Sequence, residues 1–266
     1  MPVQISAARD ITWSQDAQTV TATGNAKAVR GDVTVTADEL VAHYKKKAGS
    51  QGQPASQNAS GVSALDEGNA ELTELDAIGN VHIYTATDNA WGDHAVYSVG
   101  QQVLVLTGKN LKLTTPQDIV TAKDSIEYYA NEHKAVARGD ALIVAKDGRS
   151  IAADVITGYF ADQAEGGKPA AQDSETLGQG GNLKKVEAVG HVIIKTTADT
   201  ATGDRGIYLP PTGQARLGGN VHIIHGPNEL AGSDALVNMK TGVATLLAGP
   251  GGQVSGVILP GSGKSQ

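Results

Sequence analysis

The stretch GNVHIYT occupies residues 79–85, and GNVHIIH occupies residues 219–225, so nearly the same seven letters recur 140 residues apart. Successive glycines of this kind are 55, 29, 31, 51, 29 and 30 residues apart. Four of the steps are close to 30, which indicates an internal repeat with two enlarged units. The glycines that open related stretches, or close the last one, are Gly24, Gly79, Gly108, Gly139, Gly190, Gly219 and Gly249.

An aspartate follows each of the first six glycines after fourteen to sixteen residues. Because these carboxylates recur once per unit, we expect them to be spread along the fold. They therefore form neither the carboxylate pair of a glycosidase nor a calcium cage. We interpret them as residues of a bend, stabilised by an Asx contact. They are Asp38, Asp93, Asp124, Asp154, Asp204 and Asp234.

Apolar residues alternate after each glycine, which predicts strands with one buried face. Short polar or glycine-bearing turns, such as VGQQ at 99–102, separate these runs and predict β-hairpins. The stretch TADELVAHYKKK at 36–47 has apolar residues at helical spacing and a capping-box pattern, but its siblings resemble strands. We favour a strand there. The sequence thus predicts an all-β fold of stacked hairpin units with a period of about 30 residues.

The two enlarged units carry inserts at 45–70 and 162–182, and both inserts fall at the same turn of the repeat. Their richness in Gly, Ser, Gln and Ala predicts flexible segments. Residues 261–266 are expected to form a disordered tail. The GSGKS sequence near this end lacks the first glycine of a phosphate loop, because Ile258 stands in its place.

Composition excludes several classes of function. The net charge of the 266 residues is −7, so nucleic acid is not expected as a partner. The chain has no Cys, and aromatic residues make up 4% of it, so the core must be aliphatic. No apolar run is long enough to span a membrane. The opening MPVQISAARD lacks the regions of a signal peptide, and we interpret Met1 as standing in place of a removed one.

Two short motifs suggest sites that we do not predict. HIIH at 222–225 offers two histidines, but positions i and i+3 of a strand face opposite sides, so no metal is expected. RGD occurs at 30–32 and at 138–140, each near a predicted hairpin or strand start, where Gly-Asp is ordinary turn chemistry. No catalytic constellation is present in the pattern, so neither an enzyme nor a cofactor is expected.

The stretch ATGNAKAVRGDVTVTADELVAHY at 22–44, echoed by AIGNVHIY and GGNVHIIHG, resembles the LptA/OstA-type lipopolysaccharide transport family. That family has a G-N-V-x-[VI] strand and then a segment ending in A-D-x-[LV]-x-x-Y. The resemblance covers most of residues 3–260 outside the inserts. It implies an open β jelly roll, or β-taco, of antiparallel strands. This is either one elongated roll over 1–260 or two family-like modules in tandem, at about 3–160 and 183–260.

The resemblance also implies a function. A protein of this kind is a periplasmic carrier that shields the lipid A acyl chains of lipopolysaccharide in an apolar groove between the inner and outer membranes. Its expected partners are lipopolysaccharide, LptC-like and LptD-like jelly rolls at the open ends, and further copies of itself end to end. The alternative is a structural or adhesive β-solenoid without a lipid ligand.

The alternating residues supply the candidate groove. In the alternative reading they form a plain packed core. The predicted groove residues are Val81, Ile83, Leu111, Leu113, Ile143, Val192, Ile194, Val221 and Ile223.

Overall fold

The computed structural model describes residues 3–46, 70–161, 183–241, 243–248 and 254–257. Both predicted inserts, apart from their bordering residues, and the predicted tail lie outside these ranges. The chain forms two compact units. The N-terminal unit comprises Met1–Pro116, Thr121–Ala135 and Asp162–Gly181, and the C-terminal unit comprises Gln117–Val120, Val136–Ala161 and Asn182–Gln266.

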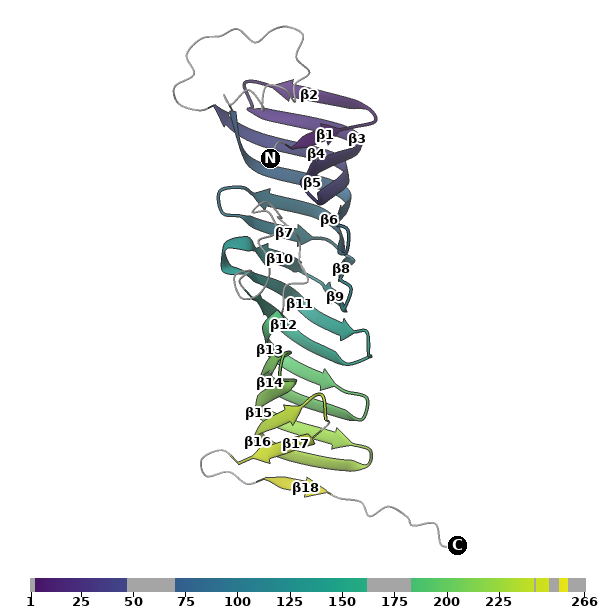
Figure 1. Ribbon diagram of the computed structural model, residues 1–266, viewed down its shortest axis with the longest axis vertical. Helices are drawn as coiled ribbons and strands as arrows, with labels where there is room; N and C mark the ends of the chain where they lie inside the picture. The colour runs from purple at the N-terminus through teal and green to yellow at the C-terminus, as the bar shows by residue number, and fades with distance from the viewer. Residues whose placement is uncertain (1–2, 47–69, 162–182, 242, 249–253, 258–266) are drawn as a thin grey trace, which may run out of the picture. The chain divides into compact units, whose positions relative to one another are not determined.

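The described residues form eighteen strands and one short 3-10 turn, which confirms the all-β prediction. Strand pairing within each unit is antiparallel, and Figure 1 shows the successive hairpins. The first ten strands and the 3-10 turn are β1 (Gln4–Ser6), β2 (Asp10–Ser14), β3 (Thr19–Arg30), β4 (Val33–Lys46), β5 (Ala70–Tyr84), β6 (Asn89–Ser98), β7 (Val103–Thr107), β8 (Leu111–Thr114), β9 (Asp118–Ala122), β10 (Ser125–Tyr129) and η1 (Ala130–Glu132). The remaining strands are β11 (Lys134–Ala145), β12 (Ser150–Phe160), β13 (Leu183–Lys195), β14 (Asp199–Leu209), β15 (Gln214–His225), β16 (Asn228–Asn238), β17 (Val243–Leu247) and β18 (Ser255–Val257).

The ambiguous stretch at 36–47 is a strand, as predicted, because it forms most of β4. Its alternate residues Leu40, Ala42 and Tyr44 are all buried. The strand partners β3 and β5 satisfy its backbone along its length. Burial of every second side chain therefore overrides the helical spacing that the same residues offer.

The repeated glycines lie inside long strands, where the pairing register shifts. In β5 the register shifts between Ile78 and Val81, and in β15 it shifts between Gly218 and Val221. Gly79 and Gly219 have φ near +78°, and the asparagine after each has φ of +47°. Two consecutive residues in the left-handed region make a bulge that bends the strand. The RGD at 138–140 lies at such a position within β11, so its expected place near a strand start was wrong.

The aspartates of the repeat face these bulges from the neighbouring strand. Asn80 donates through Nδ2 to Asp38 Oδ2 over 2.8 Å, and Asn220 donates to Asp204 Oδ2 over 2.9 Å. A Cβ on Gly79 would overlap the Asp38 carboxylate. The structural interpretation of the aspartates as bend residues is thus confirmed at these positions. The partner is a side chain across the sheet rather than one within the same turn.

The bulges divide each unit into two walls. In the N-terminal unit β2 pairs with β3 before its bulge and β1 pairs with β3 after it. In the C-terminal unit β17 and β18 pair with opposite halves of β16. Wall A contains β2 and β7 in the N-terminal unit and β17 in the C-terminal unit. Wall B contains β1 and β8 in the N-terminal unit and β18 in the C-terminal unit.

The two walls of a unit pack against each other through their inner side chains. In the N-terminal unit Ile5 of wall B packs against a cluster of Val20, Ala42 and Tyr44 on wall A. In the C-terminal unit a Cβ on Gly206 of wall A would lie 3.4 Å from Val192 of wall B. The core of each unit therefore lies between its walls.

Candidate functional site

The predicted groove residues each follow a repeat glycine in the sequence, and most are fully buried. Leu113 and Ile143 are half-buried, whereas the other seven have exposed fractions of 0–3%. They come from β5, β8, β11, β13 and β15. The structure therefore places the larger part of the set in the interior of the two units, and it leaves the role of these residues in lipid binding as a prediction.

Cross-strand pairing joins these residues into apolar rows. In the C-terminal unit Ile194 lies opposite both Ile151 and Ala201, and Ala201 lies opposite Ile223 on its other side. Ile223 in turn lies opposite Leu230. One row of aliphatic side chains thus crosses β12 to β16 on the inner face of wall B.

Wall A of the C-terminal unit presents a complementary row of small or branched side chains. These buried residues are Val186, Ala188, Ala215, Leu217, Ala235 and Val237. Tyr208 lies in the same row, opposite both Val186 and Ala215, so this face is mainly aliphatic and carries one aromatic ring. Separation of the walls would expose a largely apolar lining.

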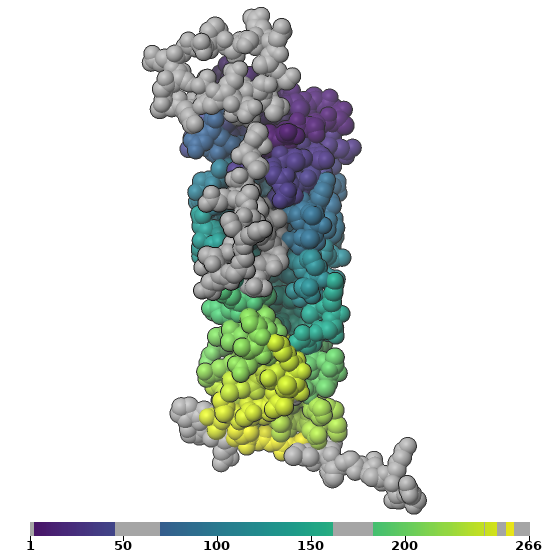
Figure 2. Space-filling view, viewed as in Figure 1, coloured from purple at the N-terminus to yellow at the C-terminus, as the bar shows by residue number. Residues whose placement is uncertain are grey.

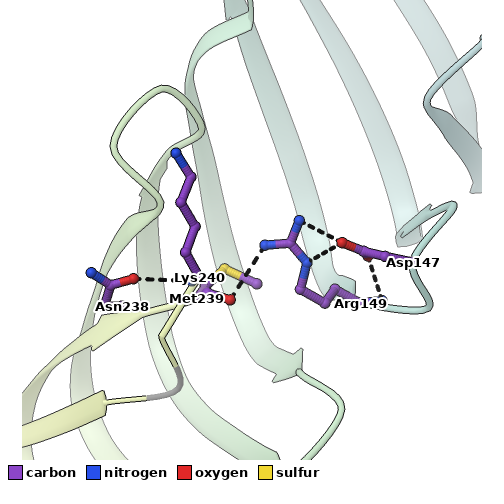
Figure 3. A network of polar contacts seen from close by, with 5 residues as sticks. All are labelled: Asp147, Arg149, Asn238, Met239 and Lys240. Carbon is purple, nitrogen blue, oxygen red and sulfur yellow. Dashed lines mark hydrogen bonds and ion pairs between the residues drawn. The ribbon is translucent and has the colours of Figure 1, made fainter.

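Arg149 connects the two rims of the C-terminal unit, as Figure 3 shows. It stands just before β12, at the rim of wall B, and its Nη1 donates to the backbone oxygen of Met239 over 3.4 Å. Met239 follows β16 at the rim of wall A. Arg149 Nη2 and Nε also lie 2.6 and 2.7 Å from Asp147 Oδ2. The guanidinium therefore closes the gap between the rims.

The electrostatics of this rim contact are those of a tight ion pair. The backbone N–H of Arg149 donates to Asp147 over 3.1 Å, and together with the guanidinium it holds the pKa of Asp147 below its usual range. Burial opposes the charge of Arg149, but Asp147 and Tyr208 raise the pKa of Arg149 overall. The turn after β16 is held in turn by Asn238 Oδ1, which accepts from the backbone N–H groups of Lys240 and Thr241 over 3.0 and 3.1 Å.

The HIIH stretch forms no shared site. His222 Nδ1 lies 3.1 Å from Glu229 Oε1, and His225 Nδ1 lies 2.5 Å from Asp199 Oδ1. Both imidazoles are exposed and each has its own carboxylate partner.

Sequence reasoning missed a hollow on the outer face of the C-terminal unit. It has a volume of about 210 Å³ and is lined by two arginines over a floor with two glycines. Arg216 Nε and Nη2 each lie 3.3 Å from Asp234 Oδ1, which offsets part of the positive charge. No sequence signal marks it, because Arg205 and Arg216 come from different strands. The lining residues are Arg205, Gly206, Ile207, Arg216, Gly218 and Asp234.

Residues 4–134 match a family described as LptA/(LptD N-terminal domain) LPS transport protein. This segment belongs to that family. The predicted resemblance is therefore confirmed for the LptA-type segment, and the family is one of transport components rather than of enzymes. The segment contains β1 to β10 and ends one residue before the N-terminal unit's boundary at Ala135.

Comparisons with curated sequences and with solved structures show weaker similarity. No curated protein sequence matches the chain significantly. Among solved structures, a similar chain is LptH from Pseudomonas aeruginosa, described as the LptA homologous periplasmic component of the lipopolysaccharide transport device. It is 17% identical, with a TM-score of 0.42, and the alignment covers 54% of this chain and 95% of that one. No helix in the described part of the chain is long and apolar enough to cross a membrane.

Proposed function

We propose that this protein is a periplasmic carrier that holds the acyl chains of lipopolysaccharide between the two walls of its units. The supporting observation is the aliphatic row on wall B, in which Ile194, Ala201 and Ile223 are buried side by side. Each buried CH₂ of an acyl chain contributes about 0.8 kcal/mol, so a lining of this kind favours long acyl chains. Membership of residues 4–134 in a family of lipopolysaccharide transport proteins supports the same ligand class.

Lipid entry requires the walls to separate. The seven buried residues of the predicted groove touch other protein atoms, so an acyl chain must take the place of contacts between the walls. Both linings are mainly apolar, so exchanging protein contacts for lipid contacts costs little. The Arg149 contact with Met239 is one rim interaction that must break in the C-terminal unit.

The C-terminal unit is proposed to be a second module of the same kind. It repeats the corner of the LptA-type segment, since Gly219, Asn220 and Asp204 are arranged like Gly79, Asn80 and Asp38. This arrangement lies outside the segment that matches the family. A chain with two such modules would offer two linings of this kind.

The terminal strands are the proposed contacts for further jelly rolls, whether LptC-like, LptD-like or second copies of this chain. Val243 of β17 and Val257 of β18 are 61% and 62% exposed. The side chains of these last strands, in yellow, lie at the surface of the C-terminal unit in Figure 2. Exposed apolar edge strands favour pairing with another sheet.

Site-specific photo-crosslinking in a Gram-negative periplasm tests the carrier function. A probe at Ile223 faces the interior, whereas a probe at the neighbouring His222 faces the solvent. We expect a lipopolysaccharide adduct at position 223 and none at 222. A folded, exported protein that gives no adduct at either position would favour the structural β-solenoid, for which the near-complete burial of the same residues is the permanent state.

A further inference from the structure

Four polar side chains gather on the outer face of the N-terminal unit, where β4, β5 and β6 run side by side. Asp76 stands at the centre of the group. Its Oδ2 lies 3.0 Å from Nε2 of His43 on β4, and its Oδ1 lies 3.5 Å from Nε2 of His94 on β6. Glu74 precedes Asp76 by two residues on β5, on the same face, and lies directly opposite His43.

The donor atoms are spaced as a metal ion requires. One ligand atom each from His43, Glu74 and Asp76 lie within 4.8 Å of one another. In a tetrahedral zinc site with bonds of about 2.1 Å, neighbouring donor atoms are about 3.4 Å apart. The separation of 3.0 Å between His43 and Asp76 is close to that value, so small side-chain rotations suffice to bring the donors onto one ion.

The cluster stands on a rigid base. Its members project from three adjacent antiparallel strands, and Thr73 Oγ1 donates to the backbone oxygen of His43 over 3.1 Å. Asp76 is 17% exposed, whereas His43 and His94 are 40% and 44% exposed. An ion could therefore reach the imidazoles from solvent while the central carboxylate is held in place.

Four other histidines have simpler surroundings. All seven histidines of the chain lie within the described residues. His191, His222 and His225 each have one carboxylate at hydrogen-bond distance. His82 stacks on Trp91, with the ring centroids 4.9 Å apart. Among the residues that the structure describes, the group around Asp76 is the one in which a histidine meets two carboxylates within coordination distance.

We propose that His43, Glu74 and Asp76 bind a divalent cation of borderline softness, with Zn²⁺ as the best fit. Imidazole and carboxylate together suit such an ion better than Ca²⁺ or Mg²⁺, which prefer oxygen ligands alone. His94 Nε2 lies 3.5 Å from the second oxygen of Asp76, where it is placed to orient the carboxylate toward the metal. The ion ties β4 to β5 three residues before β4 ends at Lys46 and four residues after β5 begins at Ala70.

Isothermal titration of the full, tag-free chain with zinc chloride, after removal of bound metal by a chelator, tests this site. We expect one Zn²⁺ per chain and a rise in the melting temperature on binding. His94→Ala should weaken binding about 10- to 100-fold, since a partner that orients a ligand contributes that much. His43→Ala and Asp76→Asn, which remove ligands, should weaken it further.

His222→Ala is the matched control, because His222 also pairs with a carboxylate but has no third ligand within the described ranges. It should leave the affinity and the stoichiometry unchanged. Circular dichroism of each variant verifies that the fold persists, as expected for partly exposed side chains. Equal Zn²⁺ binding by wild type and His43→Ala, loss of binding in His222→Ala, or no binding by the wild type would overturn the proposal.

Discussion

The side-chain amide of Asn80 donates to the carboxylate of Asp38 on the neighbouring strand. The two residues stand at the bend between wall A and wall B, and Asn80 reaches this carboxylate because Gly79 before it has a positive φ. The same relationship joins Asn220 to Asp204 in the other unit. The repeat of the sequence is therefore a repeat of bends.

Gly79→Ala should destabilise the N-terminal unit strongly. Alanine at φ +77° costs about 1–2 kcal/mol, and its Cβ would also overlap the Asp38 carboxylate. We expect a total loss of at least about 2 kcal/mol in the free energy of unfolding, measured by urea denaturation. Gly226→Ala is the control, because φ is +57° there but no atom lies within 4 Å of the added Cβ. Equal losses for both variants would contradict the role of the carboxylate.

His191 should titrate above the ordinary range of histidine. Its hydrogen bond to Asp154, over 3.0 Å, and the charge of that carboxylate raise the pKa of His191. The stabilisation is present when the imidazole is charged, below the pKa of the unfolded state, and it is lost as pH rises through the higher folded value. NMR titration of the imidazole should show a raised midpoint that Asp154→Asn lowers. Asp204→Asn should lower it less, since Asp204 contributes a weaker charge interaction.

Asp88→Asn should stabilise the protein at pH 7. Asp88 is 1% exposed, and neither carboxylate oxygen has a hydrogen-bond partner among the described residues. Burial raises the pKa of Asp88, so folding favours its neutral form and stability falls as pH rises through the folded pKa. We expect a gain on the order of 1 kcal/mol at pH 7. The gain should vanish in acid, where wild-type Asp88 is protonated in both states.

Asp199 provides the control for this change. Asp88 and Asp199 occupy equivalent turns in different hairpins. The backbone N–H of Asp88 donates to the hydroxyl of Thr85, and that of Asp199 donates to the hydroxyl of Thr196. Asp199, however, has the imidazole of His225 as its partner at 2.5 Å. Asp199→Asn should therefore give no gain at pH 7. Urea denaturation of both variants at neutral and acidic pH makes the comparison, and equal gains would contradict the explanation.

Arg149→Lys should loosen the rim of the C-terminal unit. Lysine keeps the charge but cannot reach Asp147 and the Met239 carbonyl with a planar fork. We expect a loss of about 1 kcal/mol and faster hydrogen exchange in the turn at 239–241. Arg216→Lys is the control, since Arg216 pairs with Asp234 on a neighbouring strand without joining the rims. Exchange rates that respond equally to both changes would contradict a closing role for Arg149.

The same variant bears on the proposed carrier function. If the rims must part for lipid to enter, Arg149→Lys should take up lipopolysaccharide faster than wild type in a fluorescence assay with a labelled lipid. Arg216→Lys should behave like wild type. If Arg149→Lys shows faster hydrogen exchange in the turn but unchanged uptake, opening of the rim does not limit lipid entry, and the proposed entry route is contradicted.

The sequence predicted the strands well because alternation survives the bends. In β15 the buried residues Ala215, Leu217, Val221 and Ile223 are all odd-numbered, on both sides of Gly219. Two bulge residues lie between the paired segments, so the phase of alternation is unchanged. Because the alternation continues unchanged across the bulge, the sequence gives no sign that the strand bends there. For this reason Gly139, which lies inside a strand, was expected near a strand start.

The group around Asp76 could not be predicted in this way. His43 and Asp76 are separated in sequence by the first insert, and their contact depends on the register in which β4 pairs with β5. The Arg149 contact with Met239 is harder still to predict, because it joins residues 90 positions apart through two strand ends that do not pair. Alternation shows which face of a strand is buried, but not which neighbours its exposed face meets.

The bends determine how insertions and added repeats change the dimensions of such a protein. The bends at Gly79 and Gly219 are each built from one Gly-Asn pair and one facing aspartate, so their position does not depend on how many residues lie in the hairpin turns. Insertions at the hairpin turns can lengthen the walls of a unit without moving the bend between them. An added repeat of about 30 residues extends the lining along its axis instead. Depth and length of the trough are therefore separately adjustable by small insertions of different kinds.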